Sequence, residues 1–178
     1  MSGIDKASES AGTVLCKSCG LCCSGHLFAW VKLRSPELEP AQALGLRVLR
    51  EPRQRGFSQP CPLWNGRCTI YTSPHYPRSC QTYKCKLLKK VLDETVILPE
   101  ALTVVQQAKE LINELELLLP ASSNSNFRER LVNRIDYLES SKELGNADLE
   151  FRQKARKLLN FYKDHFGVKD IVDNLDEI

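Results

Sequence analysis

The sequence predicts an α+β protein, in which a small, irregular cysteine-rich module with short strands and a short helix is followed by an all-α region of about three amphipathic helices. Two observations lead to this prediction. All eight cysteines of the 178-residue chain lie in its first half. The second half instead repeats apolar residues every three or four positions, which is typical of helices with one buried face. We therefore expect residues 1–13 to be a disordered N-terminus, 14–90 to form the cysteine module and 91–178 to form the helical region.

The cysteines occur in two groups, in the segments CKSCGLCC and CPLWNGRCTIYTSPHYPRSCQTYKC. A C-x2-C step brings two thiolates to one side of a tight loop, and tetrahedral zinc sites and iron–sulfur clusters share this arrangement. A module this small and this rich in turn-forming residues also needs more than apolar burial to hold it together. We therefore expect a metal-binding module whose ligands are Cys16, Cys19, Cys22, Cys23, Cys61, Cys68, Cys80 and Cys85.

The N-terminal sequence bears on whether these cysteines pair as disulfides. The segment MSGIDKASESAGTVL has no basic stretch followed by an apolar run, so no secretory signal is predicted. We expect a cytoplasmic protein, and stable disulfides are rare in that reducing compartment. Disulfide pairing stays open as the alternative for a secreted protein. No apolar run approaches the length of about 18 residues that a membrane span needs, so we expect no membrane partner.

Charge is distributed unevenly along the chain. Residues 1–90 contain 14 Lys and Arg against 5 Asp and Glu, whereas residues 91–178 contain 11 against 17. Basic residues near a cysteine cluster lower thiol pKa values and neutralise metal-bound thiolates, which is the simplest explanation of the excess. A nucleic-acid partner is one alternative, and the lack of aromatic residues interleaved with these charges weighs against it. Electrostatic docking between the basic and acidic halves of the chain is another.

The first half predicts only short elements. Residues 26–33 are rich in aromatic and β-branched side chains and predict a strand, and residues 35–45 predict a short helix that starts at Ser-Pro and stops at Gly. Residues 46–49 predict a second strand, and residues 51–60 predict a loop. The Asn65-Gly66 pair predicts a small hairpin with a cysteine on each arm.

The second half predicts three longer helices. The first runs between Pro99 and Pro120, and the second starts at Asn126, which can cap it together with Glu129. A third lies between residues 146 and 167, where a glycine ends the apolar pattern. Such helices either pack on the cysteine module or pair with a protein partner or a second copy of the chain.

The cysteine motifs resemble a known family. CKSCGLCC, then CPLWNGRCTIY, then a C-x4-C pair is similar to the CxxCxxCC cysteine-cluster family of YkgJ-like proteins, which are described as zinc- or iron-chelating domains. The resemblance covers about residues 14–88 and implies a metal-binding module, with no established reaction. Family members carry an Arg-Pro soon after the Ile-Tyr step, whereas a longer loop, residues 72–79, follows it here.

Both zinc and an iron–sulfur cluster suit an all-sulfur ligand set. Zinc would use the cysteines as two tetrahedral four-sulfur sites, whereas one iron–sulfur cluster would use four and leave four for zinc, a second cluster or redox chemistry. Neighbouring side chains such as those of Cys22 and Cys23 often point in different directions, which would let them serve different sites. His26 and His75 are secondary candidates, because eight thiols suffice without them.

The favoured interpretation is a non-enzymatic metal-binding protein with a metal, redox or partner-binding role. Two alternatives stay open. One is an iron–sulfur-dependent protein-modifying enzyme similar to the lysine-N-methylases, which carry a similar cysteine cluster. The other is a zinc-stabilised interaction module with a basic surface. The chain has no Gly-rich phosphate loop and no Ser/His/Asp order, so no catalytic residue is predicted.

Overall fold

The computed structural model describes residues 9–141 and 143–169. Its elements, in chain order, are α1 (Ala11–Cys19), β1 (Trp30–Lys32), the 3₁₀-helix η1 (Ser35–Glu37), α2 (Leu38–Ala43), β2 (Val48–Glu51), β3 (Gln54–Ser58), α3 (Arg78–Thr82), α4 (Lys86–Leu92), α5 (Leu98–Glu116), α6 (Phe127–Ser140), α7 (Asn146–Phe161) and the π-helical turn η2 (Tyr162–Phe166). A mixed α+β protein with a helical C-terminal region is therefore confirmed.

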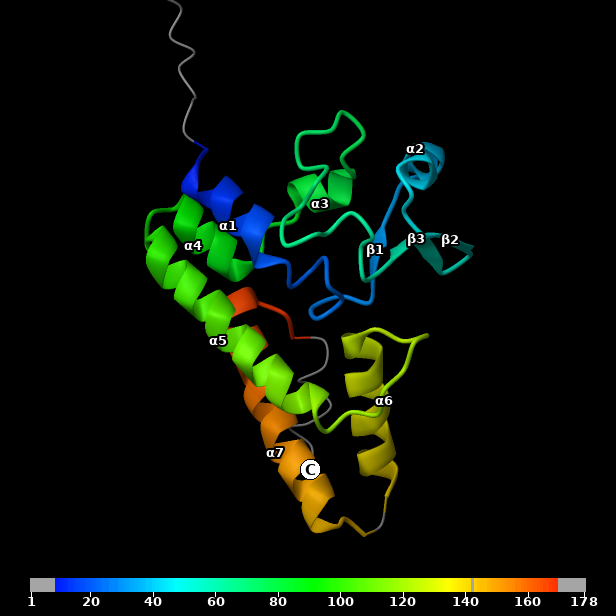
Figure 1. The fold of residues 1–178 in the computed structure, drawn as a ribbon, viewed down its shortest axis with the longest axis vertical. Helices are drawn as coiled ribbons and strands as arrows, with labels where there is room; N and C mark the ends of the chain where they lie inside the picture. Colours follow the sequence, from blue (N-terminus) through cyan, green and yellow to red (C-terminus); the bar gives the residue numbers. More distant parts are fainter. Residues whose placement is uncertain (1–8, 142, 170–178) are drawn as a thin grey trace, which may run out of the picture.

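The helices form one arm of the molecule and the small sheet forms the other. In Figure 1, α1 and α4 lie against the upper part of α5, and α7 runs along its lower part, while α6 stands opposite this pair. The three strands and α2 lie across from α1, and α3 sits between them. The cysteine-bearing segments therefore occupy the space between the helical arm and the sheet.

The first cysteine pair lies on a helix, so the tight loop expected there is wrong. The side chain of Ser10 caps α1 by accepting a hydrogen bond from the Thr13 amide at 3.2 Å. Gly20 ends α1 in the left-handed conformation at φ 75°. Residues 11–13, which the sequence assigned to a disordered terminus, therefore belong to this helix, and residues 1–8 lie outside the described part of the chain.

The sheet is antiparallel, with strand order β1-β3-β2. The strand expected over residues 26–33 shortens to the three residues of β1, and the loop expected over 51–60 is wrong because it contains β3. Gly56 explains why a loop was expected at residues 51–60 and why β3 pairs with β1. A Cβ atom on it would lie 1.9 Å from the carbonyl oxygen of Val31, so only glycine allows β1 to approach this closely.

The remaining short elements follow the sequence in part. The helix expected over residues 35–45 is confirmed as η1 and α2, and Gly45 ends it with φ 87°. The hairpin at Asn65-Gly66 is present as a tight turn with a single bridge between Trp64 and Cys68. α3 and α4 were not predicted from the sequence. Prolines and turn-forming residues surround α3, and each helix is shorter than two full helical turns.

All three long helices are confirmed. The predicted capping box at the start of α6 is present, since the Asn126 side chain accepts from the Glu129 amide at 3.0 Å and the Glu129 carboxylate accepts from the Asn126 amide at 3.0 Å. α7 continues into η2, and Gly167 ends that turn at φ 74°. Among the described residues, no helix combines the length and apolar character needed to cross a membrane.

The larger hydrophobic core joins the two halves of the chain. It includes Leu15, Leu21 and Leu27 from the first half together with residues of all the long helices. A smaller core under the sheet contains Leu33, Ala41, Leu46 and Phe57. Packing is therefore continuous across residue 90, where the boundary between the two expected regions falls.

Asn126 adds a polar link between the halves. Besides capping α6, its side-chain amide donates to the carbonyl oxygens of Ala29 at 3.3 Å and Gln59 at 3.4 Å. The backbone amide of Arg128 also donates to the carbonyl oxygen of Gly25 at 3.2 Å. The start of α6 is thereby fixed against the backbone that follows the first cysteine group and against the end of β3.

Candidate metal centre

One cavity of about 270 Å³ lies between α1, α4 and the sheet. Its walls are mostly apolar, and they include the side chains of all eight cysteines: Cys16, Cys19, Cys22, Cys23, Cys61, Cys68, Cys80 and Cys85. Each of these cysteines is a free thiol of intermediate exposure. The fold therefore brings together residues that are up to 69 positions apart in the sequence.

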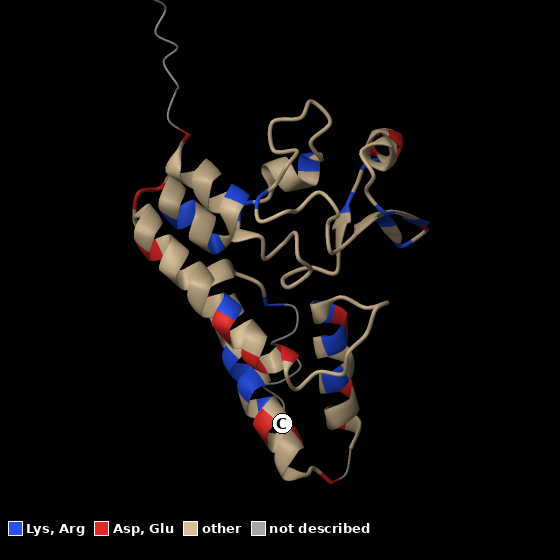
Figure 2. Cartoon of the chain, viewed as in Figure 1, with Lys and Arg blue, Asp and Glu red and all other residues tan. Residues whose placement is uncertain are grey.

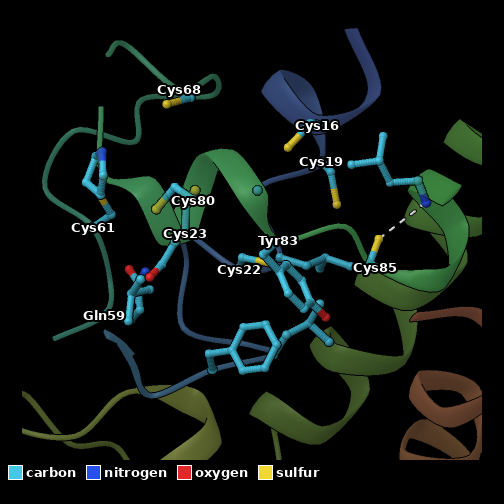
Figure 3. A pocket seen from close by; sticks show the side chains of 18 of the residues that line it. Cys16, Cys19, Cys22, Cys23, Gln59, Cys61, Cys68, Cys80, Tyr83 and Cys85 are labelled. Carbon is cyan, nitrogen blue, oxygen red and sulfur yellow. Dashed lines mark hydrogen bonds between the residues drawn. The ribbon is translucent and has the colours of Figure 1, made fainter. Parts of the chain in front are cut away.

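The thiols divide into two groups across the cavity (Figure 3). The helix-side group consists of Cys16, Cys19, Cys22 and Cys85. The sheet-side group consists of Cys23, Cys61, Cys68 and Cys80. Cys19, Cys22 and Cys85 pack against the larger core, whereas Cys61 and Cys80 pack against the smaller one. The two groups therefore rest on different parts of the fold.

Electrostatic contacts between the thiols give the same division. The thiol charges that most strongly raise the pKa of Cys23 are those of Cys61, Cys68 and Cys80. Cys22 is influenced by Cys19, then by its chain neighbour Cys23, and then by Cys85 and Cys16. Cys16 lies nearest the boundary, since its pKa responds to Cys85 first and to Cys68 second.

Local structure explains how the helix-side group forms. Cys16 and Cys19 are three residues apart on α1 and so lie on the same face of that helix. The left-handed Gly20 then turns the chain sharply, which brings Cys22 back towards them. Cys85 is the N-cap of α4, and its sulfur accepts the Leu88 amide at 3.4 Å.

The sheet-side group is assembled by backbone contacts between the two cysteine segments. The Cys61 amide donates to the carbonyl oxygen of Cys23 at 2.7 Å, and the Cys68 amide donates to that of Lys17 at 3.2 Å. Cys80 is presented by α3. This helix is held in place where the Ser79 hydroxyl donates to the carbonyl oxygen of Lys32 on β1 at 2.5 Å.

Burial keeps the thiols protonated in the absence of a cation. Desolvation, reinforced by neighbouring thiols, raises the pKa of Cys16 to about 11 and that of Cys80 to about 12. Desolvation also raises the pKa of Cys19 to about 11 and raises those of Cys22 and Cys23 further. Because a metal binds thiolates, loading such a site must release protons.

Backbone N–H groups oppose the rise in pKa that burial causes at four of the thiols. The amides of Leu21 and Leu88 lower the pKa values of Cys19 and Cys85, which belong to the helix-side group. In the sheet-side group, the amides of Leu63 and Ile70 do the same for Cys61 and Cys68. Hydrogen bonds of this kind favour the thiolate over the thiol, although burial still holds the pKa of all four thiols above its ordinary value.

Lysine side chains add positive charge around the cavity, as the basic first half predicted. Burial raises the pKa values of Cys68, Cys85 and Cys19, and the charges of nearby lysines partly offset this rise. The lysines are Lys17 for Cys68, Lys89 for Cys85 and Lys109 for Cys19. Figure 2 shows the basic bands on α1 and α4 beside the cysteine segments. Two of these lysines come from the first half of the chain, whereas Lys109 lies on α5 and was not expected to take part.

The donor set suits a soft metal, although the sulfurs stand apart from one another. Within residues 9–141 and 143–169, no group of three or more Cys, His, Asp or Glu side chains is arranged to hold a metal ion directly. No carboxylate is among the residues that line the cavity, so its potential ligands there are thiols. Four thiols per group match the ligand number of a tetrahedral zinc ion or of one iron–sulfur cluster.

The two secondary histidine candidates do not line the cavity. His26 instead packs against neighbouring side chains. Its Nδ1 lies 2.6 Å from the Ser24 hydroxyl oxygen, and its ring forms a T-shaped contact with that of Phe127, with ring centroids 5.1 Å apart. His75 lies in the exposed loop before α3.

Two cavity residues were not expected from the sequence. Gln59 is 5 % exposed, and its Oε1 atom has no hydrogen-bond partner among the described residues. It lies beside Cys23 in Figure 3. Tyr76 also lines the cavity, and burial with the nearby thiols raises the pKa of its hydroxyl. No pattern in the sequence sets these two apart, because their place depends on how distant segments meet.

Comparison of the chain with family models, curated proteins and solved structures found no match. The resemblance of the cysteine motifs to the CxxCxxCC family therefore stays a prediction.

Proposed function

We propose that this chain is a metal-binding protein that coordinates zinc or iron–sulfur clusters through its eight cysteines. In this proposal, the helix-side and sheet-side groups each hold one centre. The observation that carries it is the convergence of all eight free thiols on one cavity of about 270 Å³, four on each side. Four thiolate ligands are typical of zinc sites and of iron–sulfur clusters.

The surroundings of the sulfurs support the proposal. Backbone amides and lysines both favour thiolates at the sites where burial alone would oppose them. The smaller core under the sheet contains only four fully buried apolar side chains, so it is a weak support for the segments around it. A metal bound by the sheet-side group would stabilise this part of the fold.

The choice of metal decides the chemistry. Bound zinc would supply a closed structural cross-link, and a bound iron–sulfur cluster would supply electron transfer. The chain itself supplies the thiols, surrounds them with mostly apolar walls and holds compensating lysines nearby. The proposed role is accordingly handling of metal or electrons, with no reaction on an organic substrate.

A protein partner or a second copy of the chain on the C-terminal helices is part of the proposal. Large apolar side chains are exposed on that half, including Leu117 at 87 % and Tyr137 at 59 % exposure. We place the protein in the cytoplasm, because free thiols at this density persist in a reducing compartment.

The test is anaerobic purification of the whole chain, followed by metal analysis and an absorption spectrum. Two zinc ions per chain in a colourless protein, or iron and sulfide with absorption near roughly 400 nm, would support the proposal. A variant with serine at all eight cysteine positions is the control and should contain neither metal. The proposal fails if reduced wild-type protein contains no metal and binds neither added zinc nor iron.

A further inference from the structure

The hydroxyl group of Tyr162 is buried without a hydrogen-bond partner. This side chain is 0 % exposed, and its oxygen has no partner among the described residues. Leaving a buried hydroxyl unpaired is unfavourable, so such groups are rare in folded proteins. A phenylalanine would fill the same space at no such cost.

Tyr162 lies in the hydrophobic core that borders the helix-side group. It begins η2, the π-helical turn that follows α7 and packs against α4, whose N-cap is Cys85. It belongs to the larger core, against which Cys19, Cys22 and Cys85 also pack. Four residues further along, Phe166 lines the cavity itself. π-helical turns are rare and are frequently found at functional sites.

The charged groups that act on the hydroxyl are one guanidinium and two thiols, and of these only sulfur can accept its proton. Burial, together with the charges of Cys19 and Cys22, raises the pKa of Tyr162, and the charge of Arg128 acts in the opposite direction. A guanidinium only donates hydrogen bonds, so it can serve the phenol oxygen but cannot accept the phenol proton. A neutral thiol is a weak acceptor, whereas a thiolate is a strong one.

We propose that Tyr162 is a positioning residue of the helix-side metal centre, whose hydroxyl donates a hydrogen bond to the Cys19 or Cys22 thiolate once metal is bound. This inference rests on the proposed function. It gives the buried hydroxyl an acceptor, because a metal-bound sulfur is a thiolate. It also makes the end of α7 part of the centre, although the ligands all come from the first half of the chain.

The test is anaerobic titration of the reduced full-length protein with cobalt(II), which reports thiolate ligation by its visible absorption. Tyr162→Phe is compared with the wild type and with Tyr137→Phe, a control on the 59 % exposed tyrosine of α6. For one of the two cobalt equivalents, we expect Tyr162→Phe to weaken binding by about 10- to 100-fold and to shift the thiolate-to-cobalt band. Tyr137→Phe should leave both equivalents unchanged.

Thermal unfolding of the metal-free proteins separates this role from a purely structural one. Metal-free Tyr162→Phe should unfold at the same temperature as the wild type or higher, since the variant lacks the unpaired hydroxyl. A wild type that binds cobalt while Tyr162→Phe gives the same affinity and spectrum overturns the role of Tyr162 alone. The same holds if the variant is destabilised without metal. A wild type that binds no thiophilic metal overturns the proposed function together with this inference.

Discussion

The indole ring of Trp64 lies directly against the α-carbon of Gly20. A Cβ atom at Gly20 would lie 2.1 Å from Cζ2 of that ring, which is far inside van der Waals contact. Gly20 also has φ 75°, a conformation that other residues seldom adopt. This contact joins the turn after the first C-x2-C step to the hairpin of the second cysteine segment, so it fixes how the two segments meet.

Replacing Gly20 with alanine should therefore destabilise the protein for two separate reasons. The left-handed conformation costs an L-residue about 1 to 2 kcal/mol, and displacement of the packed indole costs about 1 to 3 kcal/mol more. Urea unfolding, followed by circular dichroism and tryptophan fluorescence, measures the sum. We expect the free energy of unfolding to fall by about 2 to 5 kcal/mol.

Gly45 provides the matched control. Its φ is 87°, but a Cβ atom there would meet nothing within 4 Å. Gly45→Ala should therefore show the conformational cost alone, about 1 to 2 kcal/mol. Equal losses for the two variants would show that contact with Trp64 contributes nothing.

Cys22 and Cys23 offer a direct test of the division into two groups. Although they are adjacent in the chain, their thiols lie in different groups. In the purified protein, Cys22→Ser should disturb the helix-side centre and Cys23→Ser the sheet-side centre, so each variant should keep about half the wild-type metal. Metal analysis of the two proteins gives the stoichiometry.

The double variant completes the experiment on these two cysteines. If the groups are separate centres, combining Cys22→Ser with Cys23→Ser should remove nearly all the metal. Loss of all metal in either single variant would contradict separate centres and would favour one shared cluster of thiols.

Asn126 should be worth more than an ordinary helix cap. Alanine removes both the cap of α6 and the two hydrogen bonds to Ala29 and Gln59. The cap alone is worth about 0.5 to 2 kcal/mol, and the buried carbonyl of Gln59 left without this donor adds about 1 to 3 kcal/mol, whereas the Ala29 carbonyl still accepts from the Gln59 amide. Equilibrium unfolding in urea should show a loss near the sum, about 1.5 to 5 kcal/mol.

Asn126→Asp separates the contribution of the α6 cap from that of the hydrogen bonds to Ala29 and Gln59. An aspartate keeps the acceptor for the Glu129 amide but has no donor for the two carbonyl oxygens. We expect it to keep α6 helical by circular dichroism while still losing stability. An aspartate variant as stable as the wild type would show that the bonds to Ala29 and Gln59 do not link the halves.

The helical half could be predicted from sequence because its signals are local. Asn126 and Glu129 are three residues apart, and the buried face of α5 repeats at helical spacing, so the chain near each residue contains the information. The same holds for the cysteines as a set, since their residue type and C-x2-C spacing identify them as candidates. These features can be predicted without knowing which distant segments each residue contacts.

The remaining features depend on contacts between distant segments. The sequence of β3 predicts a loop because glycine is unfavourable in a strand. Gly56 is favourable here only because the backbone of Val31 packs closely against it. The separation of Cys22 from Cys23 requires Cys85 on one side and Cys61 on the other. Tyr162 looks like any core aromatic residue until its hydroxyl is found buried without a partner among the described residues.

His26 should make the metal-free protein less stable in mild acid. Burial lowers its pKa from the ordinary 6.5 to about 4, with Lys109 and Arg130 contributing and Glu116 opposing. As pH falls from 6.5 towards 4, the unfolded chain therefore binds a proton that the folded chain does not, and stability is lost across this window. Between pH 7 and pH 5 we expect a loss of about 2 kcal/mol from this group, measured by urea unfolding of the reduced, metal-free protein. His26→Gln should flatten the slope, whereas His75→Gln, on the exposed loop, should not. An unchanged slope in His26→Gln would show that another group is responsible.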